Sequence, residues 1–397
     1  MHLTAARSAM VALGLAMVSV GCADIGPTSK PAAEGVPPSP ERLAVANGDA
    51  SCRPAPLEQR AAQVLVVGLP GVTVSSDPMV DEVLAVGVGG VLVTEPNVES
   101  SSQVGQLVSD LRALAGRPLV VSTGEESGRV STFRELIGPS SSARSLADRN
   151  TPEEVQAVAG ELGSKLAALG VDVDLAPVVD LDAGPANGPI GDRSFSADPS
   201  TASAYGLAWA EGLASAGVRP TVKHFPGHGR VADDSHLGLP IVDATLDELR
   251  ASDLVPFANL IAAGAPLVML DHIAYTALDS DLPASLAPKA YELLREMGFE
   301  GVAITDSVGM GAVNLHWSFP EAAVLAVVAG ADAVLTTDGS QARGMRDALV
   351  EAVRSGRLPE ARLDEAAGRM TALAGGDPVA MVCRDFELPR MSTSPGS

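Results

Sequence analysis

The feature that most constrains the fold of this chain is an alternation, repeated eight times, of a short apolar run and a longer helical pattern. The short runs are rich in β-branched residues and apolar throughout, which is typical of parallel strands covered on both faces. Eight such units in roughly 320 residues predict an α/β fold, a single (β/α)8 barrel of the TIM type. The expected strands are Val64–Gly68, Gly89–Thr94, Pro118–Thr123, Asp172–Pro177, Thr221–Phe225, Leu267–Asp271, Gly301–Thr305 and Ala333–Leu335.

The intervening helices carry recognisable start signals. Thr151 is a good N-cap residue, and it is followed by Pro152 and two glutamates in the expected first turn. A doubly wound open sheet is the alternative architecture, but the glycine-rich phosphate-binding pattern that it often carries is absent after the first strand. The clearest expected helices are Pro152–Leu169, Ala202–Ala216, Leu246–Ala263 and Pro320–Ala329.

The N-terminal residues predict export. Residues 1–21 contain one basic residue, Arg7, no acidic residue, and an apolar run too short to span a bilayer comfortably, as in a secretory signal peptide. The order Ser-Val-Gly-Cys at 19–22 resembles a bacterial lipobox, in which the cysteine is lipidated. We therefore expect Cys22 to anchor an exported protein to the cell membrane, with plain secretion into the cell wall or medium as the alternative.

The remaining boundaries follow from composition. Residues 22–54 are rich in Pro and Ala and predict a tether; residues 55–383 are assigned to the barrel and 384–397 to a disordered tail. The chain has three cysteines. If Cys22 carries the lipid, Cys52 and Cys383 remain at the two ends of the barrel, where an oxidising setting predicts a disulfide between them. Two buried free thiols are the alternative.

Composition excludes one class of partner. With 27 Lys+Arg against 49 Asp+Glu, the formal net charge is −22, and aromatic residues make up only 3%. A nucleic-acid-binding protein needs a basic face and commonly uses stacking rings, so we expect no nucleic-acid partner. A single barrel without an obvious second domain favours a monomer.

Polar residues gather where the expected strands end, which is where (β/α)8 barrels place their active sites. Three of the six histidines fall within residues 223–236, and this is the strongest functional signal in the chain. The residues at or just after strand ends are Glu125, Glu126, Asp180, Lys223, His224, Asp271, His272 and Asp306.

The histidine-rich loop is compatible with two chemistries. His224, His228 and His236 would be the ligands of a metal site, but Pro226 and Gly227 prevent a helix from placing the first two on one face. Alternatively, Asp234 orients His236, which then carries a proton as a general acid or base. A solvated loop with incidental charges is the third interpretation.

Several ordered motifs now point to a family. Lys-His-Phe-Pro-Gly-His-Gly at 223–229, followed by Asp-Ser-His at 234–236 and Gly-Leu-Pro at 238–240, resembles the signature of the glycoside hydrolase family 3 β-N-acetylhexosaminidases. The segments 174–180, 190–195, 301–306 and 329–332 resemble further motifs of that family, so the similarity covers roughly residues 55–375. Together with the leader, the chain is similar to exported actinobacterial members that act on peptidoglycan fragments.

The resemblance implies a retaining exo-β-N-acetylglucosaminidase that removes terminal β-linked N-acetylglucosamine from peptidoglycan-derived glycans without a metal or other cofactor. It implies that Asp306 is the nucleophile and that His236, paired with Asp234, is the acid/base group, in place of the second carboxylate of most glycosidases. The implied sugar-binding residues are Lys223, His224, Arg193, Glu125 and Arg129.

Two positions depart from the family pattern. Gly124 replaces an Asp whose carboxylate binds hydroxyls of the non-reducing sugar, and Ser307 replaces a second Asp after the nucleophile. An uncompensated loss of the first contact would cost about 1–3 kcal/mol. The departure at Gly124 leaves a catalytically weakened sugar-binding lipoprotein of the same fold as one alternative function. A phosphorylase is a second alternative, because a neutral His base does not repel an incoming phosphate as a carboxylate would. A metal-dependent barrel hydrolase that uses the histidine cluster is the third.

Overall fold

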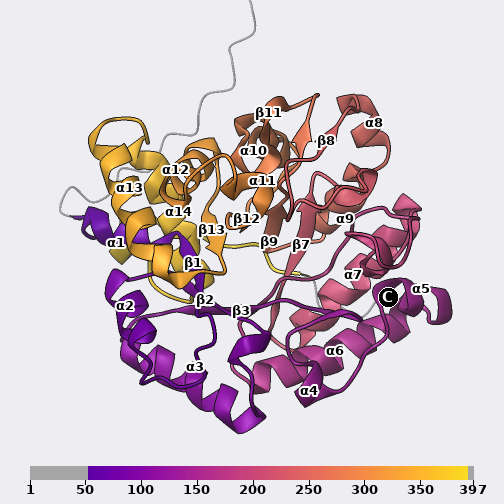
Figure 1. The fold of residues 1–397 in the computed structure, drawn as a ribbon, viewed down its shortest axis with the longest axis horizontal. Coiled ribbons are helices and arrows are strands. Elements are labelled where there is room, and N and C mark those ends of the chain that lie inside the picture. Colours follow the sequence, from indigo (N-terminus) through magenta and orange to yellow (C-terminus); the bar gives the residue numbers. More distant parts are fainter. Residues whose placement is uncertain (1–51, 392–397) are drawn as a thin grey trace, which may run out of the picture. The chain divides into compact units, whose positions relative to one another are not determined.

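The computed structural model describes residues 52–391, and these form the predicted barrel (Figure 1). Eight parallel strands close in the order β1–β13–β12–β9–β7–β6–β3–β2, so each barrel strand pairs with the next barrel strand along the chain, and the last, β13, closes the barrel on the first, β1. The predicted signal peptide, the predicted lipidation site Cys22, most of the predicted tether and the last six residues lie outside the described residues. The barrel strands are β1 Leu65–Gly68, β2 Gly90–Val93, β3 Val120–Thr123, β6 Val173–Asp174, β7 Arg219–Phe225, β9 Leu267–Leu270, β12 Val302–Ser307 and β13 Ala333–Thr336.

Helices surround the barrel and connect its strands (Figure 1). The expected start of the helix after Thr151 is confirmed, because the Thr151 side chain accepts the Glu154 N–H and the Glu154 side chain accepts the Thr151 N–H. The main helices are α1 Leu57–Gln63, α2 Pro78–Val86, α3 Ser101–Ala115, α6 Pro152–Ala168, α7 Pro199–Ser215, α8 Leu246–Ala251, α9 Leu254–Ala262, α10 Pro288–Glu296, α12 Phe319–Ala329, α13 Ala342–Arg354, α14 Glu360–Leu373 and α15 Pro378–Val382.

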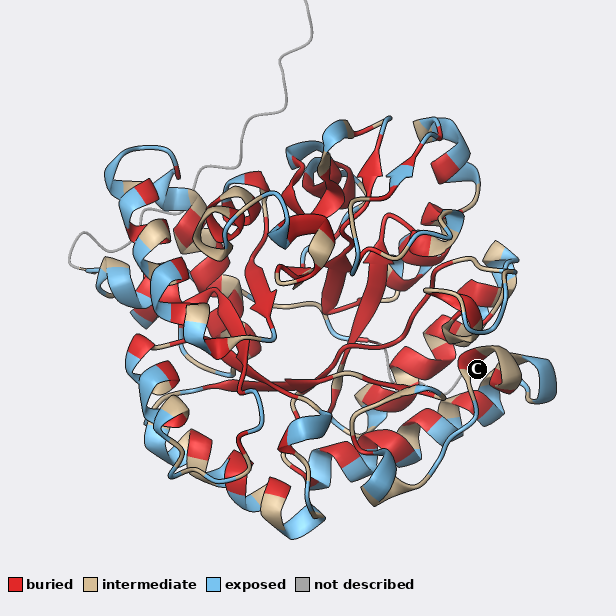
Figure 2. Cartoon of the chain, viewed as in Figure 1, coloured by how far each residue is buried: buried red, intermediate tan, exposed pale blue. Residues whose placement is uncertain are grey.

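The core has two layers, which explains why the strands are apolar throughout. In β1, Val66 belongs to the cluster inside the barrel, whereas Leu65 and Val67 pack outward among the helices. Successive side chains of a strand point to opposite faces, so both faces of each strand are buried here. Figure 2 shows the strands as the buried centre and exposed residues mainly on the outer sides of the helices.

The prediction of one helix over Leu246–Ala263 is wrong. The structure has two helices, α8 and α9, separated by Ser252 and Asp253. Pro256 has no N–H and would interrupt the hydrogen bonds of a continuous helix, whereas the break places it in the first turn of α9, where proline is tolerated. The predicted strand Asp172–Pro177 is likewise shorter, because only Val173–Asp174 forms the ladder.

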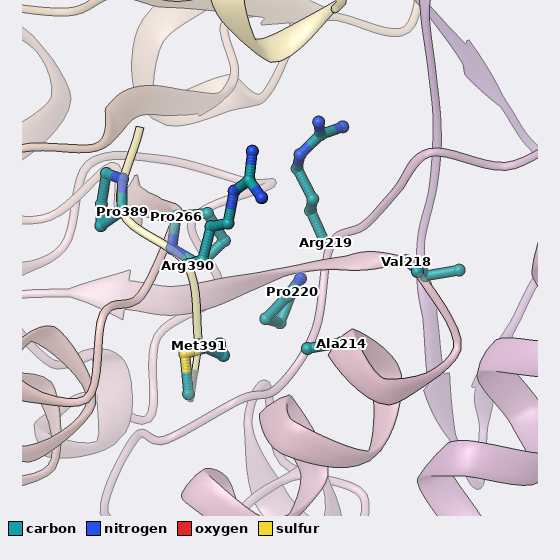
Figure 3. Close-up of a pocket in the computed structure, with 9 residues that line it drawn as sticks. Ala214, Val218, Arg219, Pro220, Pro266, Pro389, Arg390 and Met391 are labelled. Carbon is teal, nitrogen blue, oxygen red and sulfur yellow. The ribbon is translucent and has the colours of Figure 1, made fainter. Parts of the chain in front are cut away.

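The prediction that residues 384–397 are disordered is wrong for residues 384–391. Met391 is buried, and Leu388 packs against the inner cluster of the barrel together with Met370 and Leu373 of α14. Figure 3 shows Pro389, Arg390 and Met391 beside Pro266, Arg219 and Pro220 at the amino-terminal end of the strands. The segment has no helix or strand, yet it covers the end of the barrel opposite the expected active site.

A disulfide joins the N-terminal and C-terminal parts of the chain segment that forms the barrel. Cys52 and Cys383 form a disulfide with a Cα–Cα distance of 5.8 Å across a sequence separation of 331 residues, which confirms that prediction. Within the described part of the chain, no helix combines the length and the apolar character needed to span a membrane.

Candidate active site

A polar cavity of about 530 Å³ opens at the carboxyl end of the barrel strands, and we call it the polar pocket. It brings together seven of the eight residues predicted from the sequence to act in catalysis or sugar binding; the eighth, Glu125, does not line it. Its lining residues are Glu126, Arg129, Val130, Asn187, Gly188, Pro189, Arg193, Lys223, His224, His228, Ala232, Asp234, Ser235, His236, Asp306 and Met310.

Asp306 is placed by the end of β12 and is partly exposed to this cavity. Its Oδ1 accepts the N–H of Ser307 at 2.7 Å, which holds the carboxylate plane. Burial raises the pKa of Asp306, but the neighbouring His272, His224 and Lys223 side chains and the Ser307 N–H together bring it below the ordinary value. The carboxylate is therefore ionised near neutral pH, as a nucleophile requires.

Lys223 and His224 are consecutive residues of β7, and alternation along a regular strand would send them to opposite faces. The register of β7 against β9 shifts between Val222 and Phe225, and both side chains line the pocket. Such an irregularity in a barrel strand can re-aim a side chain next to an active site. Because the strand pairing is irregular at this point, two consecutive residues of one strand, Lys223 and His224, both face the pocket.

Glu126 holds the cationic side of the pocket together. It lies in β4 (Glu125–Ser127), where its Oε1 accepts Lys223 Nζ at 2.5 Å and its two carboxylate oxygens accept Arg193 Nε at 2.6 Å and Nη2 at 2.7 Å. Burial would raise the pKa of Glu126, but the charges of Arg193 and Lys223 keep it far below the ordinary value. The sequence places Glu126 at a strand end, but no sequence signal shows that it faces the cavity.

Glu125 differs from its predicted role. The structure buries its side chain completely, where Oε2 accepts the Phe133 N–H at 2.9 Å. Burial raises the pKa of Glu125. Neighbouring residues of a strand point to opposite sides, so when Glu126 faces the pocket Glu125 faces the protein interior. Glu125 therefore holds the loop, while Glu126 occupies the site.

Arg129 lines the pocket but is engaged with the neighbouring loop. Its Nε donates to Asp192 Oδ1 at 2.9 Å, and its Nη2 donates to the carbonyl oxygens of Pro189 at 3.2 Å and Ile190 at 2.9 Å. This loop carries Arg193, whose Nη1 also donates to Pro189 O at 3.0 Å. Arg129 thus fixes the loop that delivers Arg193.

His224 is part of a buried histidine–aspartate pair. Its Nδ1 lies 2.6 Å from Asp180 Oδ2, and its Nε2 lies 3.3 Å from Arg193 Nη2. Since a guanidinium can only donate, Nε2 accepts and the proton resides on Nδ1, which donates to Asp180. Asp180 Oδ1 also accepts the N–H groups of His224 and His228. The sequence places Asp180 after the fourth strand but does not indicate its contacts with His224 and His228.

His228, which the sequence offers as a candidate metal ligand, supports the loop that carries Asp234 and His236. Its Nε2 lies 3.1 Å from Ser235 Oγ. Burial and the neighbouring His224 lower the pKa of His228 to about 4, so the ring is neutral near pH 7. His228 thereby connects the Asp180 cluster to the loop that carries Asp234 and His236.

The predicted Asp234–His236 pair is formed on that loop. Asp234 Oδ1 lies 2.8 Å from His236 Nδ1 and accepts the His236 N–H at 2.9 Å. The loop is fixed against the segment after β12, because Gly311 N–H donates to His236 O at 3.1 Å. A Cβ on Gly311 would lie 2.4 Å from His236 O, so this close approach needs glycine. The acid/base candidate is therefore held against the chain that carries Asp306.

A second cavity, of about 370 Å³, meets the polar pocket at Asp306, His236 and Met310, and we call it the neutral cavity. Its remaining lining residues are Leu92, Thr94, Gly124, Thr132, Leu175, Ser307, Gly309, Leu335 and Thr337. Across residues 52–391, no group of three or more His, Cys, Asp or Glu side chains is placed to hold a metal ion.

Comparison with known proteins agrees with the geometry. Residues 57–373 match the family described as "Glycosyl hydrolase family 3 N terminal domain". Beta-hexosaminidase LpqI of Mycobacterium tuberculosis is 37% identical over 327 residues, which are 80% of this chain and 83% of that protein. Its solved structure superposes with a TM-score of 0.76 at 37% identity, covering 83% of this chain and 98% of that one. A β-N-acetylhexosaminidase from Beutenbergia cavernae superposes with a TM-score of 0.74 at 32% identity, covering 83% and 100%.

Proposed function

Because the chain belongs to glycosyl hydrolase family 3 and is a glycoside hydrolase of the β-N-acetylhexosaminidase type, we propose that Asp306, His236 and Asp234 release terminal β-linked N-acetylglucosamine with retention. One observation carries the assignment of roles. An ionised carboxylate and an imidazole already paired with a carboxylate line the same cavity at the carboxyl end of the barrel. This is the constellation that a double displacement at an anomeric carbon needs.

In the first step, an Asp306 oxygen attacks the anomeric carbon while the bond to the leaving oxygen breaks. His236 gives its proton to that oxygen, so the aglycone leaves as a neutral alcohol and the sugar is esterified to Asp306. Asp234 stabilises the imidazolium before transfer and holds Nδ1–H, which directs the other ring nitrogen to the reaction.

In the second step, neutral His236 takes a proton from water, whose oxygen attacks the anomeric carbon and displaces Asp306. The product has the β configuration of the substrate, and both side chains return to their starting protonation states. Lys223 and Arg193 use N–H groups beyond those that bind Glu126 to donate to sugar hydroxyls.

We further propose that the natural substrate is a peptidoglycan-derived glycan and that lipidated Cys22 holds a monomeric enzyme at the outer face of the cell membrane. The disulfide between Cys52 and Cys383 supports an oxidising, exported setting. Cys22→Ala should move the protein from the membrane fraction to the medium in the native host. Membrane retention of this variant would contradict the anchor.

A chromogenic β-N-acetylglucosaminide assay tests the mechanism. Wild type should release the chromophore and the β-anomer of the sugar, and Asp306→Ala should lower kcat by about 10⁴-fold or more. Saturable sugar binding without turnover by wild type would instead indicate a sugar-binding lipoprotein. A glycosyl phosphate product in phosphate buffer would indicate a phosphorylase, and loss of turnover in a chelator would indicate a metal-dependent hydrolase.

A further inference from the structure

The two cavities that meet at Asp306 differ in charge. The polar pocket is lined by five charged groups besides Asp306, namely Glu126, Arg129, Arg193, Lys223 and Asp234. Among the described residues that line the neutral cavity, only the shared Asp306 and His236 can carry a charge. The neutral cavity is therefore suited to a group that needs neither an ion pair nor a strong hydrogen bond.

The floor of the neutral cavity is apolar. Leu92, Leu175 and Leu335 are 6%, 5% and 2% exposed and belong to the cluster inside the barrel. Two of the hydroxyls at its wall are already used, because Thr94 Oγ1 donates to Asn97 Oδ1 at 3.0 Å and Thr132 Oγ1 donates to Gly124 O at 3.1 Å. A sugar hydroxyl placed here would leave its hydrogen bonds to water and find few hydrogen-bond partners in the protein, whereas an apolar group has no hydrogen bonds to give up.

Two small uncharged residues, Gly124 and Ser307, form part of the wall of this cavity. A Cβ built on Gly124 meets no atom within 4 Å, so the space in front of this residue is open. Neither residue brings a charge to the cavity, and Gly124 leaves room that a longer side chain at the same position would occupy.

The position of the cavity indicates which part of the substrate enters it. The anomeric carbon must lie at Asp306, and the aglycone must leave past His236, whose side chain is 68% exposed. The neutral cavity ends on residues from inside the barrel, so it cannot pass a long aglycone. It therefore receives a part of the non-reducing sugar itself.

We propose that the neutral cavity is a subsite for an uncharged acyl substituent on that sugar, so that the enzyme accepts O-acylated N-acetylglucosamine, and that Gly124 is the residue that determines this specificity. The proposal rests on the glycosidase function above. A short ester group places its methyl or methylene carbons against the leucines, and no buried charge opposes its entry.

The test compares Gly124→Asp, Gly124→Leu and wild type on 4-nitrophenyl β-N-acetylglucosaminide and on its 3-O-, 4-O- and 6-O-acetyl derivatives. Wild type should hydrolyse at least one acetyl derivative with a kcat/KM near that for the unsubstituted sugar. Both variants should lower kcat/KM for that derivative by about tenfold or more, because each fills the cavity. The measured quantity is the ratio of kcat/KM for that derivative to kcat/KM for the unsubstituted sugar, and both variants should lower this ratio.

Gly105→Asp is the matched control. Gly105 lies in α3, away from the lining of both cavities, and a Cβ there also meets no atom within 4 Å. It should not change the ratio of kcat/KM between acylated and unsubstituted substrates. Turnover of the unsubstituted sugar but of none of the acetyl derivatives would overturn this inference alone. Failure on every substrate, with Asp306→Ala indistinguishable from wild type, would overturn the glycosidase function as well.

Discussion

The active site contains two histidine–aspartate pairs that share their chemistry and differ in their surroundings. His224 Nδ1 lies 2.6 Å from Asp180 and His236 Nδ1 lies 2.8 Å from Asp234, and both histidines line the polar pocket. The side chains of the first pair are 5% and 0% exposed, whereas those of the second are 68% and 43% exposed. Burial is thus the main difference between the pairs.

Burial determines what each pair can do. In the buried pair both ring nitrogens of His224 have partners and Asp180 also accepts two backbone N–H groups, so the ring is fixed. In the exposed pair only Nδ1 of His236 has a partner among residues 52–391, which leaves the other nitrogen for a proton transfer. The same two residue types therefore position a sugar in one place and move a proton in the other.

Breaking the buried pair of His224 and Asp180 should have the largest effect, a loss of free energy of unfolding. Asp180→Ala leaves His224 Nδ1–H and two backbone N–H groups without their acceptor in the protein interior. Removing one partner of a buried pair costs about 3–5 kcal/mol, so the free energy of unfolding in urea should fall by that amount. Asp234→Ala is the matched control and should change it by less than about 0.5 kcal/mol. Equal losses in both variants would contradict the comparison.

Removing the exposed histidine should affect catalysis and leave stability unchanged. His236→Ala should lower kcat/KM by about 10²- to 10³-fold for aglycones that are poor leaving groups, because general acid catalysis typically contributes at least this much. Activated nitrophenyl glycosides should lose far less, since their leaving oxygen needs no proton. A plot of log kcat/KM against the pKa of the leaving group measures this. An equal loss on all substrates would exclude His236 as the acid.

The sequence predicts the site residues that have a local pattern, and it does not predict those that act through contacts between distant parts of the chain. Asp306, Lys223 and His224 follow from their places at strand ends, and the Asp234–His236 pair follows from its spacing. Glu126 and Asp180 act through contacts with residues far away in the sequence; Glu126 and Arg193, for example, are 67 positions apart. No local pattern reports such contacts, and a single step along a strand decides between Glu125 and Glu126.

The fold shows the same limit. Periodicity predicts the eight strands because each one is buried on both faces. The segment 384–391 packs against the end of the barrel without helix or strand, so no periodic signal distinguishes it from a disordered tail. Similarly, Leu246–Ala263 has a helical apolar pattern throughout, and only the missing N–H of Pro256 marks the break.

His228 connects the two pairs and should make their scaffold sensitive to pH. The pKa of its ring is about 4 in the folded protein against 6.5 for an ordinary histidine, so the unfolded chain binds more protons between these values. Stability is therefore complete above pH 6.5 and should fall by about 3 kcal/mol as the pH decreases to 4. Asp180 and Asp306, whose pKa values are lowered in the fold, should add a further loss below about pH 4.

His228→Gln tests this assignment, because the amide can still bond to Ser235 but does not titrate. The free energy of unfolding of this variant should vary much less than that of wild type between pH 6.5 and 4. Urea denaturation at several pH values measures the difference. An unchanged pH dependence would assign the effect to other groups.

The smallest expected effect concerns the exposed carboxylate. Asp234→Asn keeps an oxygen that accepts the His236 N–H and removes the charge that faces the ring. An exposed ion pair contributes about 0.2–1 kcal/mol, so kcat/KM for poor leaving groups should fall by only about two- to fivefold. Salt screens exposed charges, so the difference between wild type and variant should shrink as ionic strength rises. A loss as large as that of His236→Ala, insensitive to salt, would mean that bound substrate covers Asp234 and makes the second pair resemble the first.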